Sequence, residues 1–192
     1  MLEEFTFKEM FNGSGFWSNK WAVQLGARGS ELLNIRNLSY LVEYNAARPY
    51  TYSHFQRITS YSGMGQPLAH PLGANFKEIL GILNYSFGRF DFQGEISRSA
   101  YGQDPSGMNY GGNIFLDYRT RSSDYGNKIG QGISTKLMYI EAKAAFLLNP
   151  KNNLRLELSY VHRNEHSIAI KDHTNIINFG LRSSFRNLYQ DF

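Results

Sequence analysis

Residues 48–54 read Arg-Pro-Tyr-Thr-Tyr-Ser-His, so a hydroxyl that could act as a nucleophile, on Ser53, stands beside a base, His54. Hydrolytic catalysis requires these two side chains to lie within hydrogen-bond reach of each other. Neighbouring residues of an extended segment point to opposite sides, and the chain has no Gly-x-Ser-x-Gly elbow. We therefore predict that the protein is not an enzyme.

Metal and nucleotide binding are not favoured by the spacing of the candidate ligands. The five His residues are scattered, no His-Glu-x-x-His motif occurs, and Cys is absent. Asp and Asn side chains between 104 and 127 offer oxygen ligands suited to calcium, but turn formation accounts for them as well. The glycines of 109–113 and 126–132 do not stand between a strand and a helix, as a phosphate-binding loop would. We predict no cofactor and no metal.

Sugar recognition is the chemistry that the remaining aromatic and polar residues suit, because a Tyr ring offers flat apolar area together with a hydroxyl group. The candidate contact residues are Arg48, Tyr50, Tyr52, His54, His70, Asn75, Asn109, Tyr110 and Tyr118. The same side chains could instead pack two long loops against each other. For 48–54 the sequence predicts an extended segment at the start of such a loop, with Arg48, Tyr50 and Tyr52 on one side and Pro49 marking the end of the preceding strand.

The elements that position these residues are predicted to be strands, because apolar and polar residues alternate with a period of two. Seven strands are expected, at 20–28, 37–45, 76–85, 90–97, 136–148, 154–163 and 177–185. The stretch 76–85 is the exception to the alternation, because it is apolar on both faces and its pattern alone also fits a helix, but its flanks favour a strand. Phe5, Phe7 and Phe11 suggest a weak eighth strand. In the last strand Phe185 is the expected end, with 186–192 as a tail. Several strands reach roughly 10 residues, the length that crosses a bilayer at a tilt.

Short and long connections alternate along the chain. The links near 29–36, 86–89 and 149–153 are short, 165–171 is intermediate, and 46–75 and 100–132 are far longer than usual in compact soluble domains. Outer-membrane barrels have this arrangement, with short periplasmic turns and long extracellular loops. We predict an all-β, antiparallel transmembrane β-barrel in one domain, 1–192, either of eight strands or as the C-terminal half of a larger barrel.

Composition limits the choice of partner. The net charge is +4 and the charged residues are scattered singly, which does not favour nucleic-acid binding. No apolar run approaches the length of a membrane helix. The N-terminal stretch MLEEFTFKEMF is acidic where an export signal is basic, and we expect a truncated chain.

Several motifs occur in an order that resembles the C-terminal part of RemB-type gliding-motility outer-membrane proteins, which are related to Wzi-like capsule-assembly barrels. The motifs are Glu43-Tyr44-Asn45, RPYTYSH (48–54), QPLAHPLGANF (66–76), NYGGNIF-LDY (109–118) and GNKIGQG (126–132). The resemblance covers the chain from about Trp17 onward. It implies an outer-membrane location, a role in surface adhesion or gliding, and as partners membrane lipid, surface polysaccharide, and motility or secretion proteins.

Two other hypotheses remain open. A soluble β-sandwich or small barrel that binds carbohydrate or protein would also show alternating strands with charges facing water. An outer-membrane enzyme would need acid and base residues inside the barrel, and Glu95, Glu141 and Glu157 have the appropriate phase in their strands.

Overall fold

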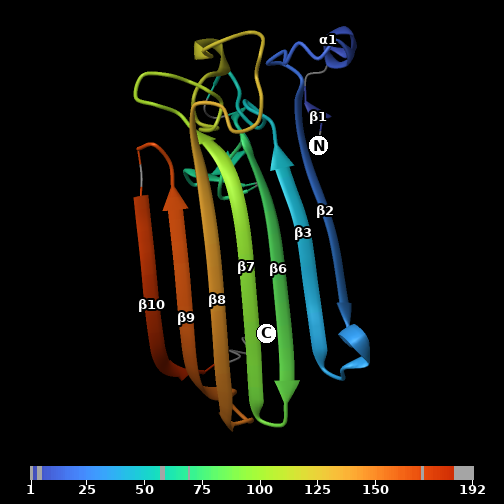
Figure 1. Ribbon diagram of the computed structural model, residues 1–192, viewed down its shortest axis with the longest axis vertical. Helices are drawn as coiled ribbons and strands as arrows, with labels where there is room; N and C mark the ends of the chain where they lie inside the picture. The colour runs from blue at the N-terminus through green and yellow to red at the C-terminus, as the bar shows by residue number, and fades with distance from the viewer. Residues whose placement is uncertain (1, 4–5, 57–58, 69, 170, 184–192) are drawn as a thin grey trace, which may run out of the picture.

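A single antiparallel sheet makes up most of the protein (Figure 1). The computed structural model describes residues 2–3, 6–56, 59–68, 70–169 and 171–183. Seven long strands follow one another in chain order: β2 (Lys20–Ser30), β3 (Leu38–Ala47), β6 (Phe76–Phe87), β7 (Phe90–Gln103), β8 (Ile133–Asn149), β9 (Leu154–His166) and β10 (Lys171–Arg182). The two-residue strand β1 (Leu2–Glu3) pairs with β2. The predicted seven strands and the all-β class are confirmed.

The sheet is open within the described residues, with β1 and β2 at one edge and β10 at the other. The alternative of a complete eight-strand barrel requires closure, which the described residues do not show. The physical reason is that β1 pairs just Leu2 and Glu3 with β2, so most of the outer edge of β2 and the outer edge of β10 have no partner strand among the described residues.

The prediction of a weak strand at Phe5–Phe11 is wrong, because Phe7–Phe11 forms the short helix α1. Phe7 and Phe11 are four residues apart, which suits one face of a helix as well as a strand pattern. The main-chain carbonyl of the N-cap residue Thr6, which has an extended conformation, accepts the N–H of Glu9. Phe5, the predicted strand end at Phe185 and the tail 186–192 lie outside the described residues.

Both long connections lie at one end of the sheet, where the short link between β9 and β10 also lies, and the other short connections lie at the opposite end (Figure 1). At the turn end, β2 and β3 are joined through the 3₁₀ helix η1 (Leu32–Asn34), and β6 and β7 through Gly88-Arg89. Gly88 has a φ of 60°, which two-residue hairpins demand. At the loop end lie 48–75, with the small ribbon β4 (Ser62–Gly63) and β5 (Gln66–Pro67), and 104–132, with the 3₁₀ helix η3 (Tyr118–Thr120). Because β7 continues to Gln103, the second loop begins later than the predicted residue 100.

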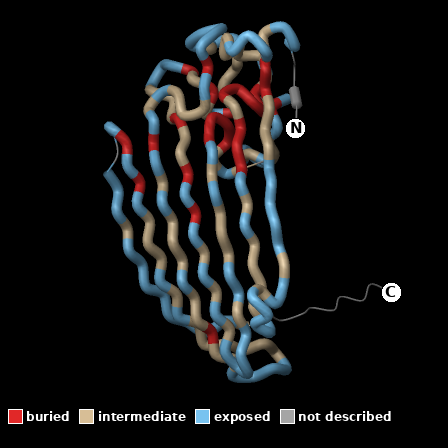
Figure 2. The backbone as a smooth tube through the Cα atoms, turned by 45° about the vertical axis from the view of Figure 1, so that its right-hand side comes forward, coloured by how far each residue is buried: buried red, intermediate tan, exposed pale blue. Residues whose placement is uncertain are grey.

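Cross-strand register sorts the side chains onto two faces. One cross-strand row runs through Leu25, Tyr44, Ile79, Arg98, Met138, Asn164 and His173, and we call this side the apolar face. The next row, on the opposite side, runs through Gln24, Asn45, Glu78, Ser99, Leu137, Glu165 and Asp172, and we call it the polar face. The well-packed core lies at the loop end, where most buried residues gather (Figure 2).

Candidate functional site

The two long loops and the segment 12–19 form one packed unit, here called the loop cluster. It covers the loop end of the polar face, since its core joins Ala47 and Phe76 of the sheet to Tyr52, Ala74 and Ile114 of the loops. In register terms Ala47 and Phe76 project on the same side as Asn45 and Glu78, which is the polar side. The cluster therefore caps the polar face and leaves the apolar face uncovered.

Asn75 ties the loop cluster together. Its side chain is fully buried, and its amide nitrogen donates to the carbonyls of Gly102 (3.2 Å) and Gln131 (2.9 Å). Its Oδ1 accepts the N–H of Gly130 at 2.7 Å. Its φ of 61° lies in the left-handed region, which Asn tolerates better than most residues. One side chain thus joins the end of β7 to the second long loop.

Tyr50 is a second buried junction, with 1% of its surface exposed. Its N–H donates to the carbonyl of Gly111 (3.0 Å) and its hydroxyl donates to the carbonyl of Asn109 (2.9 Å). Gly111 has to lack a side chain, because a Cβ there would lie 2.4 Å from the Tyr50 nitrogen. Burial raises the pKa of Tyr50 to about 12, so the hydroxyl keeps its proton and its donated bond at neutral pH.

Arg48 connects three segments of the chain through main-chain carbonyls. Its guanidinium donates to Asn19 (2.8 Å), to Phe16 (3.4 Å) and to Asn127 (3.1 Å). Partial burial lowers the pKa of Arg48 from its usual value. The contacts explain a positive charge at this position without any bound ligand.

The predicted extended conformation of 48–54 is wrong, because Tyr50 and Tyr52 have φ values of 66° and 70° and lie in successive turns. The Ser53 hydroxyl donates to the carbonyl of Tyr50 at 2.9 Å, which holds it in the turn. The main-chain N–H of His54 donates to the hydroxyl of Ser60 at 3.3 Å. These contacts make this stretch a structural junction of the loop cluster.

His70 fixes the first long loop to the sheet. Its Nδ1 accepts the N–H of Leu72 (3.2 Å), so the hydrogen on Nε2 is available for Glu78, 2.9 Å away. The imidazole also stacks on Phe76, with ring centroids 4.2 Å apart. Glu78 in turn accepts the hydroxyls of Ser97 (2.8 Å) and Ser99 (3.0 Å), which makes a connected polar network beneath the loop.

Asn109 and the aspartates shape the second long loop. The Asn109 amide donates to the carbonyl of Asp117 (3.0 Å) and its Oδ1 accepts the N–H of Gly111 (3.0 Å). Asp104 accepts the N–H of Tyr110 at 2.6 Å and that of Asn113 at 2.8 Å. The described residues contain no group of three His, Cys, Asp or Glu that could hold a metal ion. The side-chain oxygens of Asp104 and Asn109, which suggested calcium, accept main-chain N–H groups of the loop instead.

Exposure divides the predicted contact residues. Tyr50, Tyr52, Asn75 and Asn109 are buried, whereas Arg48, His54, His70, Tyr110 and Tyr118 are partly exposed. The buried group supports the loops from inside, which is the packing interpretation for those four side chains. A ligand at the surface could reach only the partly exposed group.

The sequence did not reveal a cation–aromatic cluster that the structure builds around Trp17. Its ring lies 4.9 Å from that of Tyr118, and the guanidinium of Arg121 lies 4.3 Å from its centroid. The Lys20 ammonium lies 4.3 Å from the Tyr118 ring. Such contacts between a cation and the face of a ring are attractive. Trp17 and Lys20 lie about 100 residues before Tyr118 and Arg121 in the chain, so no local sequence pattern predicts their contact.

The polar face below the cluster carries ion pairs along one strand, between adjacent strands, and from β9 across β8 to β7. Arg155 pairs with Asp91, and Arg182 with Glu157 (3.2 Å). Glu141 pairs with Lys143 (3.4 Å) and lies directly opposite Glu95. Glu95, Glu141 and Glu157 therefore all project from the polar face, as the alternation predicts. Glu141 and Glu157 are engaged in ion pairs.

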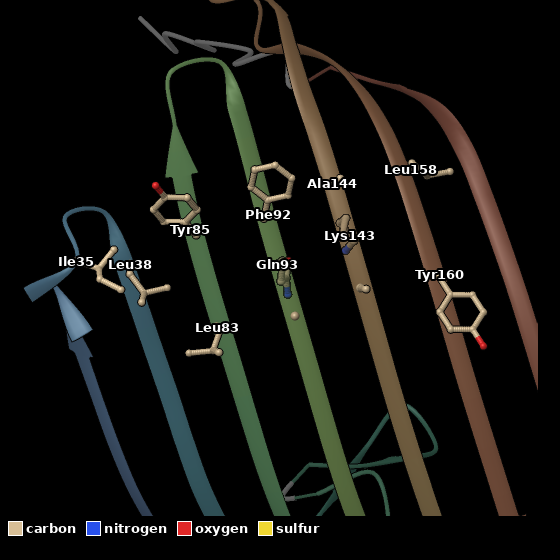
Figure 3. A pocket seen from close by; sticks show the side chains of 12 residues that line it. Ile35, Leu38, Leu83, Tyr85, Phe92, Gln93, Lys143, Ala144, Leu158 and Tyr160 are labelled. Carbon is tan, nitrogen blue, oxygen red and sulfur yellow. The ribbon is translucent and has the colours of Figure 1, made fainter. Parts of the chain in front are cut away.

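The apolar face has large exposed side chains. Leu25, Ile177 and Phe179 have exposed fractions of 65%, 74% and 72%. Figure 3 shows Leu83, Phe92 and Tyr160 among the residues around a hollow of about 810 Å³ near the turn end. A soluble sandwich would bury such a face under a second sheet, and among the described residues the only other sheet is the ribbon β4–β5.

Comparisons with known proteins add no further constraint. No helix among the described residues has both the length and the apolar character needed to span a membrane. No protein-family model, no curated protein and no solved structure matches this chain.

Proposed function

We propose that this chain forms part of a non-enzymatic outer-membrane β-barrel whose loop cluster caps the extracellular mouth. The observation that carries the proposal is the distribution of packing between the two faces. The loops cover the loop end of the polar face, while the apolar face exposes side chains such as Leu25, Ile177 and Phe179. Lipid is a solvent that suits an uncovered apolar face, and the polar face then borders the lumen.

Strand length and connection length support the same proposal. Strands of 10 to 17 residues are long enough to cross a hydrocarbon core at a tilt. The open edges fit a larger barrel, in which further strands pair with β2 and β10 and leave no unpaired backbone in lipid.

Surface adhesion during gliding, with surface polysaccharide and motility or secretion proteins as partners, belongs to this proposal through the family resemblance. Four of the five motifs that carry the resemblance come together in one place, and the fifth, Glu43-Tyr44-Asn45, lies in β3. Residues 48–54, 66–76, 109–118 and 126–132 all contribute to the loop cluster, and Tyr50, Asn75 and Arg48 bond across them. A rigid cap at the extracellular end is a suitable platform for such contacts.

Cysteine labelling on intact cells tests this topology, because the chain contains no native cysteine. Met64 is fully exposed at the loop end, and Lys151 is exposed at the turn end. We expect a membrane-impermeant maleimide to label Met64→Cys in the full-length protein on intact cells. Lys151→Cys should react only after the outer membrane is permeabilised.

Three outcomes would contradict the proposal. Labelling of both positions on intact cells, or of Lys151→Cys alone, would contradict the orientation. Recovery of the unlabelled protein in the soluble periplasm without detergent would favour a soluble sheet whose apolar face binds another protein.

A further inference from the structure

The apolar face carries charge only near the loop end, and the permanent charges there are all positive. The four cations on this face are Lys77, Arg98, Lys136 and Lys171, here called the cationic belt. Across the described residues of the seven long strands, every Asp and Glu projects from the polar face instead. The two signs of charge are thus separated by the sheet.

Strand register places the belt in one narrow band. Lys77 pairs with Ala100, Ala100 with Lys136, Lys136 with His166, and His166 with Lys171, so three lysines occupy one row across five strands. Arg98 lies two residues further along β7, in the next row of the same face. Lys77 of β6 and Lys136 of β8 lie on either side of β7, the strand that carries Arg98. Because neighbouring strands are about 4.8 Å apart, the main chains at Lys77 and Lys136 are separated by roughly 10 Å.

The belt cations are exposed and have no carboxylate partner. All four are exposed to solvent, and none takes part in an ion pair in the part of the chain that the structure describes. The ion pairs of the strands, such as Arg155 with Asp91, lie on the polar face. Four like charges on one band without counter-charges repel one another, and an external anion would relieve that repulsion.

A hollow of about 400 Å³ lies among three of the belt cations. The hollow is lined by Tyr44, Lys77, Glu78, Ile79, Arg98, Ser99, Ala100 and Lys136. The side chains of Glu78 and Ser99 project from the opposite, polar face. Cationic groups therefore surround a partly apolar floor. Toward the turn end the same face continues with apolar residues such as Ile96 and Ile140, so charge gives way to apolar surface within one or two rows.

We propose that the cationic belt binds the phosphate groups of anionic lipids in the membrane leaflet on the loop side. The inference rests on the proposed function, because it requires the apolar face to meet lipid. Acyl chains would lie against the apolar rows while the headgroup phosphate reaches Lys77, Arg98 and Lys136. Arg and Lys side chains extend toward the headgroups from such positions, and phosphate suits the donors of both.

The experiment measures lipid retention by the full chain, purified in a neutral maltoside detergent, by native mass spectrometry. Dioleoylphosphatidylglycerol is the anionic probe and dioleoylphosphatidylcholine the zwitterionic one. The variant Lys77→Gln/Arg98→Gln/Lys136→Gln should bind phosphatidylglycerol on the order of 100-fold more weakly, from roughly fivefold for each cation lost at an anionic surface. Phosphatidylcholine retention should not change.

A matched control removes three cations elsewhere. Arg28, Lys128 and Lys151 are exposed, lie outside the belt, and form no side-chain bond or ion pair in the described chain. Arg28→Gln/Lys128→Gln/Lys151→Gln makes the same change in net charge and should keep the phosphatidylglycerol affinity within about twofold. Lys77→Arg/Lys136→Arg should bind like the wild type, which separates lost charge from lost folding.

The belt is refuted if both triple variants lose affinity equally, or if the wild type retains the two lipids alike. Displacement of phosphatidylglycerol by an equal concentration of inorganic phosphate would assign the site to free anions and overturn the lipid assignment. Selective retention together with failed cell-surface labelling of Met64→Cys would contradict the proposed function while supporting the belt.

Discussion

Replacing Asn75 by alanine should loosen the loop cluster more than any substitution of an exposed loop residue. The change removes two donated bonds, to Gly102 and Gln131, and the acceptor of the Gly130 N–H. It also places an alanine in the left-handed region, at a φ of 61°. Both effects act on a fully buried side chain, so water cannot replace the lost partners without opening the cluster.

The magnitude follows from these contacts. Each lost hydrogen bond costs about 0.5–1.5 kcal/mol, and alanine in the left-handed conformation costs about 1 kcal/mol more than glycine. The free energy of opening of the loop cluster should therefore fall by roughly 3 to 5 kcal/mol. Asn75→Gly removes the bonds without the strain and should recover about 1 kcal/mol of this loss.

Asn37 provides the matched control. It also has a positive φ, of 62°, but it is exposed at the turn end and its side chain forms no hydrogen bond with the residues that the structure describes. Asn37→Ala should cost only the backbone strain, about 1 kcal/mol.

Hydrogen exchange of the Gly102 and Gly130 amides measures the effect in the detergent-solubilised protein. Exchange should accelerate by roughly two to three and a half orders of magnitude in Asn75→Ala, and the amides of β9 should be unaffected. Equal exchange rates in Asn75→Ala and Asn37→Ala would refute the assignment of Asn75 as the junction.

Three further predictions use other contacts. The contribution of Tyr50 to the stability of the loop cluster should be constant below about pH 10, the usual pKa of a tyrosine. It should be lost as the pH rises through the folded pKa of Tyr50, about 12. Near-ultraviolet absorbance measures this alkaline loss, which should vanish in Tyr50→Phe. Gly111→Ala should destabilise the cluster by more than about 3 kcal/mol, because the new Cβ would lie 2.4 Å from the Tyr50 nitrogen. The Cβ of Gly126→Ala would meet no atom within 4 Å, so this variant should cost about 1 kcal/mol. Urea unfolding measures both losses of stability. Leu158→Lys should weaken folding into phosphatidylcholine vesicles by about 2 to 4 kcal/mol, and Ser159→Lys, on the polar face, by less than about 1 kcal/mol; equal effects would contradict the assignment of faces.

Local pattern predicted most of the strands, although the flanks decided the one at 76–85 and the last strand begins at Lys171, before the predicted residue 177. Leu156, Leu158 and Tyr160 alternate with polar residues, and the period of two determines both the strand and the face on which each side chain lies. The same reasoning failed at Phe7 and Phe11, where two aromatics four residues apart fit a helix equally well.

Long-range pairing was beyond the sequence. Tyr50 and Tyr52 have positive φ values, and the main chain of Tyr50 bonds to Gly111 in the other long loop, a partner that the sequence does not indicate. Likewise, Lys77 and Lys136 look like isolated charges until the register of β6, β7 and β8 brings them into one row. Residue type indicated which loop side chains could contact a ligand. The fold was needed to separate the buried side chains, which support the loops, from those that a ligand at the surface could reach.

The central claim is that the apolar face of the sheet meets lipid, and lipid accessibility along β9 tests it most directly. Single cysteines at positions 156 to 161 of the full-length protein, labelled with an environment-sensitive fluorophore in native outer membranes, would be quenched by doxyl-labelled lipids. We expect strong quenching at Leu156, Leu158 and Tyr160 and weak quenching at Glu157 and Ser159. Uniform quenching, or strong quenching at Glu157 and Ser159 instead, would contradict the claim.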